Sequence, residues 1–268
     1  MASRIRCNGA DLAYEDSGGV HPTVLFSHGL LYSRRMWDRQ VAELRSGFRC
    51  IGYDHRGQGE SEMSATGLDM DTLTLDAVAL VESLGIAPVH FVGHSMGGFV
   101  GMRIAARRPE LVRSLALIDS SAGPEPAENL PRYRRLEWVA RWIGTWVVAG
   151  KVEAIMHGAT ARRDPARAAE LRTWRDDLLH LDPEPMIRAV EGVLQREAAF
   201  PLLPAIRCPT LVVVGEEDTA TVPAKSVELA AGIAGARLVR IPRAGHLSPI
   251  DAPEAVTAEL RTFLDAVR

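Results

Sequence analysis

The sequence has little cysteine and no long apolar run. Its 268 residues include only Cys7, Cys50 and Cys208, which lie far apart and form no CxxC pair. So sparse a set excludes a disulfide-stapled scaffold and a cysteine zinc site. No stretch approaches the roughly 18 apolar residues of a membrane-spanning helix, and the first residues lack the apolar core of a signal peptide. We therefore expect a cytoplasmic protein without a membrane partner.

An excess of charge of one sign is lacking as well. The formal net charge is −3, with 24% charged and 47% hydrophobic residues. This balance gives no electrostatic reason to expect nucleic acid or an anionic membrane surface as a partner. The sequence also contains no Walker A motif, no GxGxxG after its first strand-like segment and no HExxH. We therefore expect no nucleotide, metal or other cofactor.

What is present is an alternation of short apolar runs with longer amphipathic segments. Continuous β-branched runs of this kind are typical of strands that are covered on both faces. They occur at residues 24–26, 50–53, 89–92, 115–118, 211–214 and 238–241. Helical patterns lie between them at 35–44, 69–84, 97–107, 223–231 and 253–267. The alternation predicts a mostly parallel α/β sheet with helices on both faces. Residues 4–7 and 12–15 predict an antiparallel hairpin that turns at Asn8 and Gly9.

One region interrupts the alternation. Residues 123–204 contain no strand pattern, begin and end with prolines, and carry helical patterns at 132–149, 166–179 and 185–196. We expect a helical cap here, inserted into a core domain of residues 1–122 and 205–268. Its twelve basic and twelve acidic residues balance, so no basic docking surface is indicated.

A nucleophile motif follows the predicted strand at 89–92. Gly93-His94-Ser95-Met96-Gly97 connects this strand to the helical pattern at 97–107. GxSxG between a strand and a helix exposes its serine on a sharp, strained turn. The close approach of strand and helix then requires glycine at positions 93 and 97.

With this motif the sequence resembles the α/β-hydrolase family, over nearly its whole length. The resemblance implies an eight-stranded, mostly parallel sheet with a helical cap. His28-Gly29-Leu30-Leu31 after the first parallel strand is similar to the family's oxyanion loop. By this likeness, the backbone N–H groups of Leu30 and Met96 would bind an oxyanion. We interpret His28 as a brace of the loop rather than a proton donor.

A second loop, residues 53–61, is similar to the family's D-x-R-G-x-G-x-S segment. Asp54 and Arg56 could be read as an acid and a substrate clamp. Charge-assisted hydrogen bonds that brace the loop are the interpretation we favour.

The acid and the base should follow later strands in the order Ser, Asp, His. Gly215-Glu216-Glu217-Asp218 follows the strand at 211–214, and Gly245-His246 follows the strand at 238–241. The family pattern G-x-x-D selects Asp218, with Glu216 and Glu217 as rivals. Asp119 stays open as an alternative, since some members of the fold place the acid after that earlier strand. The predicted triad is Ser95, Asp218 and His246.

The predicted activity is hydrolysis of a carboxylic ester or lactone of a small organic substrate through an acyl-enzyme. Residues 36–40 and 53–57 look like bacterial carboxylesterases and 3-oxoadipate enol-lactonases. A carbon–carbon bond hydrolase and a cofactor-free perhydrolase of the haloperoxidase kind remain alternatives, because they use the same triad. A non-catalytic receptor for a small ligand is a further alternative.

Three tryptophans lie in the predicted cap at spacing i, i+4, i+8. Trp138, Trp142 and Trp146 would share one face of a single helix over 132–149. This face could pack the cap onto the core or line the substrate pocket. We expect the three tryptophans to line the pocket and bind substrate.

Overall fold

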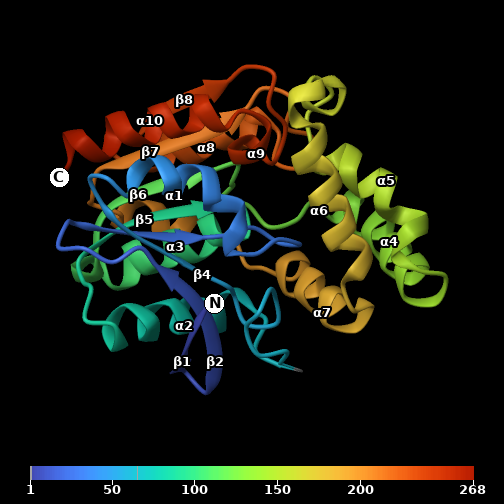
Figure 1. Cartoon of the computed structure of the whole chain (residues 1–268), viewed down its shortest axis with the longest axis horizontal. Helices are drawn as coiled ribbons and strands as arrows, with labels where there is room; N and C mark the ends of the chain where they lie inside the picture. The colour runs from blue at the N-terminus through green and yellow to red at the C-terminus, as the bar shows by residue number, and fades with distance from the viewer. Residues whose placement is uncertain (1, 65) are drawn as a thin grey trace.

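The computed structural model describes residues 2–64 and 66–268. Its centre is one eight-stranded sheet in the order β1-β2-β4-β3-β5-β6-β7-β8 (Figure 1). The strands are β1 (Ser3–Cys7), β2 (Ala10–Asp16), β3 (Thr23–Ser27), β4 (Arg49–Tyr53), β5 (Val89–His94), β6 (Val112–Ile118), β7 (Thr210–Gly215) and β8 (Arg237–Ile241). β3 to β8 run parallel to one another. β2 runs antiparallel to both of its neighbours, β1 and β4. The predicted fold class is therefore confirmed.

The first two strands form the predicted hairpin. Asn8 and Gly9 connect them with φ angles of 46° and 81°. Two consecutive left-handed residues match the twist of a two-residue hairpin, and Asn-Gly tolerates both.

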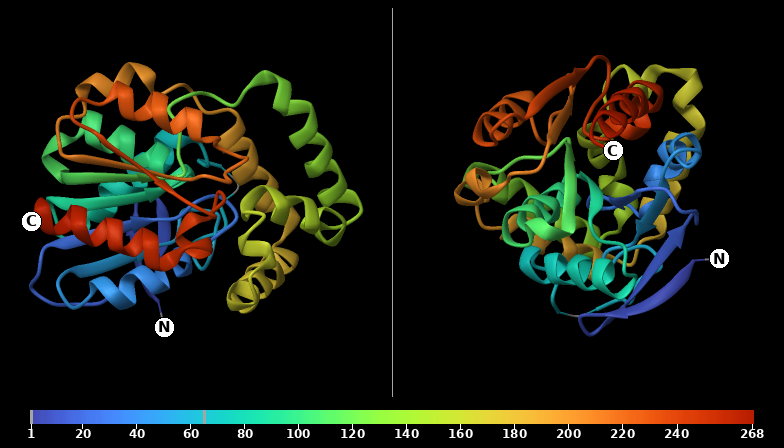
Figure 2. Two further views of the ribbon diagram at one scale, coloured as in Figure 1. Left: turned by 90° about the horizontal axis from the view of Figure 1, so that it is seen from above. Right: turned by 90° about the vertical axis from the view of Figure 1, so that its left-hand side faces the viewer.

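Helices cover both faces of the sheet (Figure 2). α2, α3 and α8 pack with one apolar cluster, whose members include Leu73, Phe99 and Leu229. α1 and α10 pack with a second cluster, which includes Leu44 and Leu260. The bounds of the core helices are α1 (Asp38–Leu44), α2 (Met70–Ser83), α3 (Met96–Arg107), α8 (Pro223–Gly232), α9 (Ser248–Asp251) and α10 (Pro253–Ala266). Short 3-10 turns include η1 (Arg34–Trp37) and η6 (Phe200–Ala205).

The segment between β6 and β7 is helical, as expected. It contains α4 (Leu130–Trp142), α5 (Thr145–Met156), α6 (Ala168–His180) and α7 (Pro183–Leu194). These helices lie together beyond one end of the sheet (Figure 1). At the base of the segment, the N–H of Ala199 donates to the carbonyl of Ala122 at 2.7 Å, so its entry and exit lie side by side. We call residues 123–204 the helical insertion and propose that they form the predicted cap.

One predicted helix is wrong in its extent. Residues 132–149 do not form a single helix, because the chain breaks between α4 and α5 at Ile143 and Gly144. Gly144 has φ 129°, which a residue with a side chain rarely adopts. Trp138 and Trp142 therefore lie on α4, while Trp146 lies on the first turn of α5.

The parallel strands place their carboxyl ends along one edge of the sheet. The loops after β3, β5, β7 and β8 meet there, next to the helical insertion (Figure 1). Open α/β sheets bind ligands at this edge. Within residues 2–64 and 66–268, none of the helices has the length and apolar character needed to cross a bilayer.

Candidate active site

Ser95 lies on a strained turn between β5 and α3. Its backbone has φ 47° and ψ −109°, a conformation that is sterically costly for a residue with a side chain. A β-carbon built at Gly93 would collide with the backbone of Gly97, and one built at Gly97 would collide with the carbonyl of Ser27. The sequence prediction that both positions need glycine is confirmed. Strand, turn and helix approach closely enough to hold the serine hydroxyl at the edge of the sheet.

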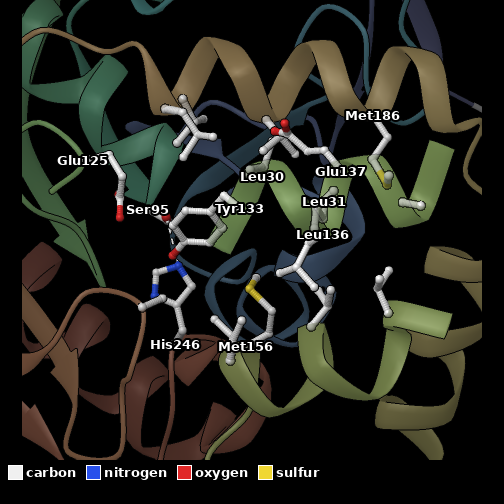
Figure 3. Close-up of a pocket in the computed structure, with 18 of the residues that line it drawn as sticks. Leu30, Leu31, Ser95, Glu125, Tyr133, Leu136, Glu137, Met156, Met186 and His246 are labelled. Atoms are coloured by element: carbon white, nitrogen blue, oxygen red, sulfur yellow. Dashed lines mark hydrogen bonds between the residues drawn. The ribbon is translucent and has the colours of Figure 1, made fainter. Parts of the chain in front are cut away.

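Three loops that are distant in the sequence bring a hydroxyl, an imidazole and a carboxylate into one row. Ser95 Oγ lies 3.0 Å from His246 Nε2 (Figure 3). On the other side of the ring, His246 Nδ1 lies 2.9 Å from Asp218 Oδ2. All three residues are buried, with Ser95 the most exposed at 8%. Both hydrogen bonds have ordinary lengths, so the ring is held between its two partners.

The carboxylates near His246 differ in their partners. Asp119 is buried, but its two oxygens accept the backbone N–H groups of Gly215 at 2.8 Å and Ser248 at 3.1 Å. Glu217 accepts hydrogen bonds from Thr160 of the helical insertion, and Glu216 is exposed. Asp218 is the acid in direct hydrogen-bond contact with the imidazole.

The charges of this row shift two pKa values in opposite directions. Burial lowers the pKa of His246, but the charge and hydrogen bond of Asp218 outweigh burial, so the pKa lies above its ordinary value. Burial raises the pKa of Asp218, and His246 together with Thr221 outweighs burial and lowers it. The neighbouring Asp119 has a raised pKa, first because of burial and then because of the charge of Asp218. The imidazole therefore favours a proton more than a free histidine does.

The expected oxyanion donors flank the serine. Leu30 lies in the loop after β3 and lines the same cavity as Ser95. Met96 is the first residue of α3, so its N–H has no carbonyl partner within the helix. The next residue, Leu31, has φ 61°, and its N–H donates to Gln58 Oε1 at 3.1 Å. This bond fixes the loop that carries Leu30.

His28, Asp54 and Arg56 have partners that fit the bracing interpretation. His28 Nε2 accepts the backbone N–H of His55 at 2.9 Å. Asp54 accepts the backbone N–H of Glu60 at 2.8 Å and pairs with a buried arginine. Arg56 donates twice to a buried carboxylate of α2, at 2.9 and 2.6 Å. None of these three residues is among the described residues that line the cavity beside Ser95.

That cavity lies between the sheet edge and the helical insertion (Figure 3). Its volume is about 160 Å³. Eleven of the described residues that line it are apolar side chains of the insertion: Leu136, Ala140, Val148, Val152, Ile155, Met156, Leu178, Met186, Val190, Val193 and Leu194. A second cavity of about 470 Å³ shares Leu31, Leu178 and Met186 with the first. The site therefore offers an apolar compartment that ends at the serine.

The alpha/beta hydrolase fold family matches residues 22–253 of this chain. The chain belongs to the α/β-hydrolase family. An enol-lactonase from Burkholderia xenovorans LB400 superposes with a TM-score of 0.90 at 32% identity, over 98% of this chain and 100% of the other. A thermophilic esterase from Thermogutta terrifontis gives 0.89 at 32% identity, over 100% and 99%. A Mycobacterium tuberculosis protein named as a candidate non-heme bromoperoxidase, BpoC, is 32% identical over 96% of this chain and 99% of its own.

In this hydrolase the three tryptophans expected on the pocket wall lie elsewhere. Trp138, Trp142 and Trp146 are 58%, 71% and 69% exposed, and none of them lines the cavity. The break at Gly144 explains part of the difference, because the tryptophans no longer share one helix. The opposite faces of α4 and α5, which carry residues such as Leu136 and Val148, line the cavity instead.

Sequence reasoning missed two residues that position His246. His94 Nε2 donates to the carbonyl oxygen of His246 at 2.6 Å, and burial, then the charge of His246, lowers the pKa of His94 to about 3. A neutral imidazole therefore holds the backbone of His246. Thr221 Oγ lies 2.7 Å from Asp218 Oδ2 and 3.2 Å from His246 Nδ1. The position of His94 inside GxSxG was a usable signal, whereas nothing in the sequence marked Thr221.

Sequence reasoning also missed the charged groups of the cavity wall. Arg196 and Glu125 form a buried ion pair at 3.3 Å, with side-chain exposures of 3% and 9%. The guanidinium lies 4.5 Å over the ring of Phe99. Glu137 on α4 also lines the cavity, and burial, then the charge of Glu191 and a hydrogen bond with it, raises its pKa to about 7. Among the residues described, no three His, Cys, Asp or Glu side chains gather as they would around a metal ion.

Proposed function

We propose that this protein is a serine hydrolase that cleaves a carboxylic ester or lactone of a small, largely apolar substrate through an acyl-enzyme. One observation carries the proposal: Ser95, His246 and Asp218 form a row with spacings of 3.0 and 2.9 Å at the end of an apolar cavity. A serine hydroxyl becomes nucleophilic when a base accepts its proton and an acid orients that base. The row has the geometry that this chemistry needs.

In the first half-reaction, Ser95 Oγ attacks the carbonyl carbon while its proton passes to His246 Nε2. Asp218 holds the other ring proton on Nδ1, and its charge stabilises the imidazolium that forms. The backbone N–H groups of Leu30 and Met96 donate to the oxyanion of the tetrahedral intermediate. The intermediate collapses when the carbon–oxygen bond of the alcohol breaks, and His246 returns the proton to the departing oxygen.

In the second half-reaction, water attacks the acyl-enzyme as His246 accepts one of its protons. The bond to Ser95 Oγ breaks, and His246 returns the proton to this oxygen. For an ester the products are an acid and an alcohol. For a lactone both groups belong to one hydroxy acid, so the same residues serve.

The substrate class is supported by the cavity and by the relatives. The walls are mainly aliphatic, which favours an apolar acyl or alcohol portion. The two similar solved structures are named as an enol-lactonase and an esterase. Both names describe cleavage of an ester bond.

A panel of p-nitrophenyl esters, lactones and a vinylogous diketone tests the proposal on the purified protein. We expect multiple turnovers on esters or lactones, and a loss of about 10⁶-fold in kcat for Ser95→Ala. Ser46→Ala, at an exposed serine, is the matched control. Ester turnover of Ser95→Ala within tenfold of wild type contradicts the proposal. Preferential cleavage of the diketone assigns the site to carbon–carbon bonds instead, and a single turnover without release assigns it to a receptor.

Perhydrolysis is a second candidate, favoured by the name of the similar M. tuberculosis protein. In this reaction hydrogen peroxide replaces water in the attack on the acyl-enzyme, and the product is a peracid. Reactions with acetate, hydrogen peroxide and bromide measure perhydrolysis, because the peracid that forms oxidises the bromide. Peracid formation faster than ester hydrolysis selects the perhydrolase.

A further inference from the structure

The outer surface of α4 and α5 exposes an unusual number of large apolar side chains. Trp138, Trp142, Ile143, Trp146 and Val147 are 58%, 71%, 52%, 69% and 42% exposed. We call these five residues the tryptophan face. Tryptophan is mostly buried in folded proteins, and a contiguous exposed apolar patch marks an interaction site.

These residues lie on the end of α4, on the turn and on the start of α5. Trp138 and Trp142 are four residues apart on α4 and so lie on the same side of it. The indole ring of Trp146 packs against the turn, because a β-carbon built at Gly144 would be 2.7 Å from it. α4 and α5 form the end of the molecule that lies furthest from the sheet (Figure 1). Within the described residues, all five side chains of this face remain exposed.

Positive charge surrounds the tryptophan face. Residues 130–156 hold five basic residues and two acidic ones, although the helical insertion as a whole is balanced. Arg132, Arg134, Arg135 and Lys151 are exposed, and within the described chain none of them has an acidic partner within 4.0 Å. The two acidic residues are occupied, because Glu137 lines the cavity and Glu153 pairs with Arg175 at 3.0 Å. The insertion therefore separates its charges and leaves this end basic.

We propose that the tryptophan face and its arginines dock the protein on an anionic lipid surface. Indole rings prefer the boundary between headgroups and acyl chains, and aliphatic side chains enter the acyl region beside them. Exposed arginines attract anionic headgroups, each by an amount that changes binding several-fold. A second copy of the chain is the less suitable occupant, because a two-fold contact would bring the same unpaired arginines together. The net charge of −3 and the balanced charge of the insertion give no reason to expect an anionic membrane partner, and the proposal departs from that expectation because the charges are segregated within the insertion.

The docked orientation has a consequence for access to the site. Leu136 and Ala140 of α4, and Val148 and Val152 of α5, line the cavity beside Ser95, while the tryptophan face lies on the opposite side of the same helices. Docking would place the helices of the cavity wall between Ser95 and the lipid. The proposal concerns binding and does not depend on the hydrolytic activity.

Vesicle sedimentation with the full chain tests the proposal. Vesicles of phosphatidylcholine alone are compared with vesicles of equimolar phosphatidylcholine and phosphatidylglycerol. We expect binding to the second kind, released by high salt because salt screens exposed charges. Ser95→Ala should bind like the wild type, so a failure of the catalytic proposal leaves this result unaffected.

Variants locate the binding surface. Trp142→Gln with Trp146→Gln should weaken partitioning by roughly tenfold or more, from the apolar burial that is lost. Arg134→Gln and Arg135→Gln should each weaken it about fivefold. Leu75→Gln and Arg113→Gln are matched controls: Leu75 is 56% exposed on α2, and Arg113 is exposed on β6. Both controls should bind like the wild type.

Several outcomes overturn the proposal. Absence of binding to the anionic vesicles does so, and so does equal binding to both kinds of vesicle. Losses of binding that are as large in the two controls as in the tryptophan and arginine variants would place the surface elsewhere. Sedimentation equilibrium that shows a dimer, lost in Trp142→Gln/Trp146→Gln and accompanied by no vesicle binding, assigns the face to contact between two copies.

Discussion

The two sides of the cavity are built differently. The side formed by the sheet edge carries Ser95, Asp218, Thr221 and His246, which are buried and linked by hydrogen bonds. The side formed by the helical insertion is mainly aliphatic. The side chains of the sheet edge can transfer protons and stabilise charge. The aliphatic side chains of the insertion can select substrates by their shape. We propose that the sheet edge performs the chemistry and that the insertion selects the substrate.

Removal of the acid at the sheet edge should have the largest effect. We expect Asp218→Asn to lower kcat by about 10⁴-fold, because the amide no longer holds the imidazole in the productive tautomer. Steady-state kinetics on the best ester measure this. Glu216→Gln, at the exposed carboxylate two residues earlier, should stay within a few-fold of wild type. Similar losses in both variants would contradict the assignment of Asp218.

The next largest effect concerns the buried ion pair at the base of the insertion. Glu125→Ala leaves the Arg196 guanidinium buried without its acid, and we expect the free energy of unfolding to fall by about 3–5 kcal/mol. Urea denaturation measures this. Glu184→Ala breaks the exposed pair with Arg141, whose side chains are 39% and 51% exposed, and should cost less than about 1 kcal/mol. Equal losses of unfolding free energy in the two variants would show that burial does not determine how much each ion pair contributes to stability.

The pH dependence of the rate tests the base. His246 must be neutral to accept the serine proton, so activity is present above its pKa and is lost as the pH falls through it. Because Asp218 raises this pKa, the midpoint of the acidic limb should lie above the ordinary value of about 6.5. Below the midpoint, kcat/KM should fall about tenfold per pH unit.

The acidic limb of the pH–rate profile needs a control variant on the insertion side of the cavity. Glu137 lines the same cavity with a pKa of about 7, so its titration has to be separated from that of His246. Glu137→Gln should keep the limb if His246 is responsible. A flat profile of the wild type between about pH 5 and 8 would contradict a histidine base.

The smallest effect concerns the shape of the insertion side. Leu136→Ala enlarges the cavity, so the preference among esters should shift toward longer acyl chains by about tenfold, with little change in kcat on short ones. Trp142→Ala, on the outer side of the same helix, should leave the preference unchanged. A shift in the tryptophan variant and none in Leu136→Ala would reverse the two faces.

The sheet edge was more predictable from the sequence than the insertion. β5, Ser95 and the glycines at 93 and 97 follow from local sterics, which a short motif records. The resemblance to the family's motifs after two predicted strands selects His246 and Asp218, with Asp119 left open as a rival acid. The insertion packs amphipathic helices whose periodicity does not say which face is inward. The break at Gly144 depends on one left-handed residue, and the tryptophan stripe therefore suggested a pocket wall where the structure has an outer surface.

The hydrogen bond between Ala199 and Ala122 joins the two connections of the insertion at their root. Chain segments whose ends meet in this way can lengthen, shorten or be exchanged without pulling apart the strands on either side. The helices above that root are thus free to diverge in length and composition while Ser95 keeps its place. A chimera that receives the corresponding segment of a relative at this junction would inherit the donor's ligand preference on an unaltered proton-transfer site.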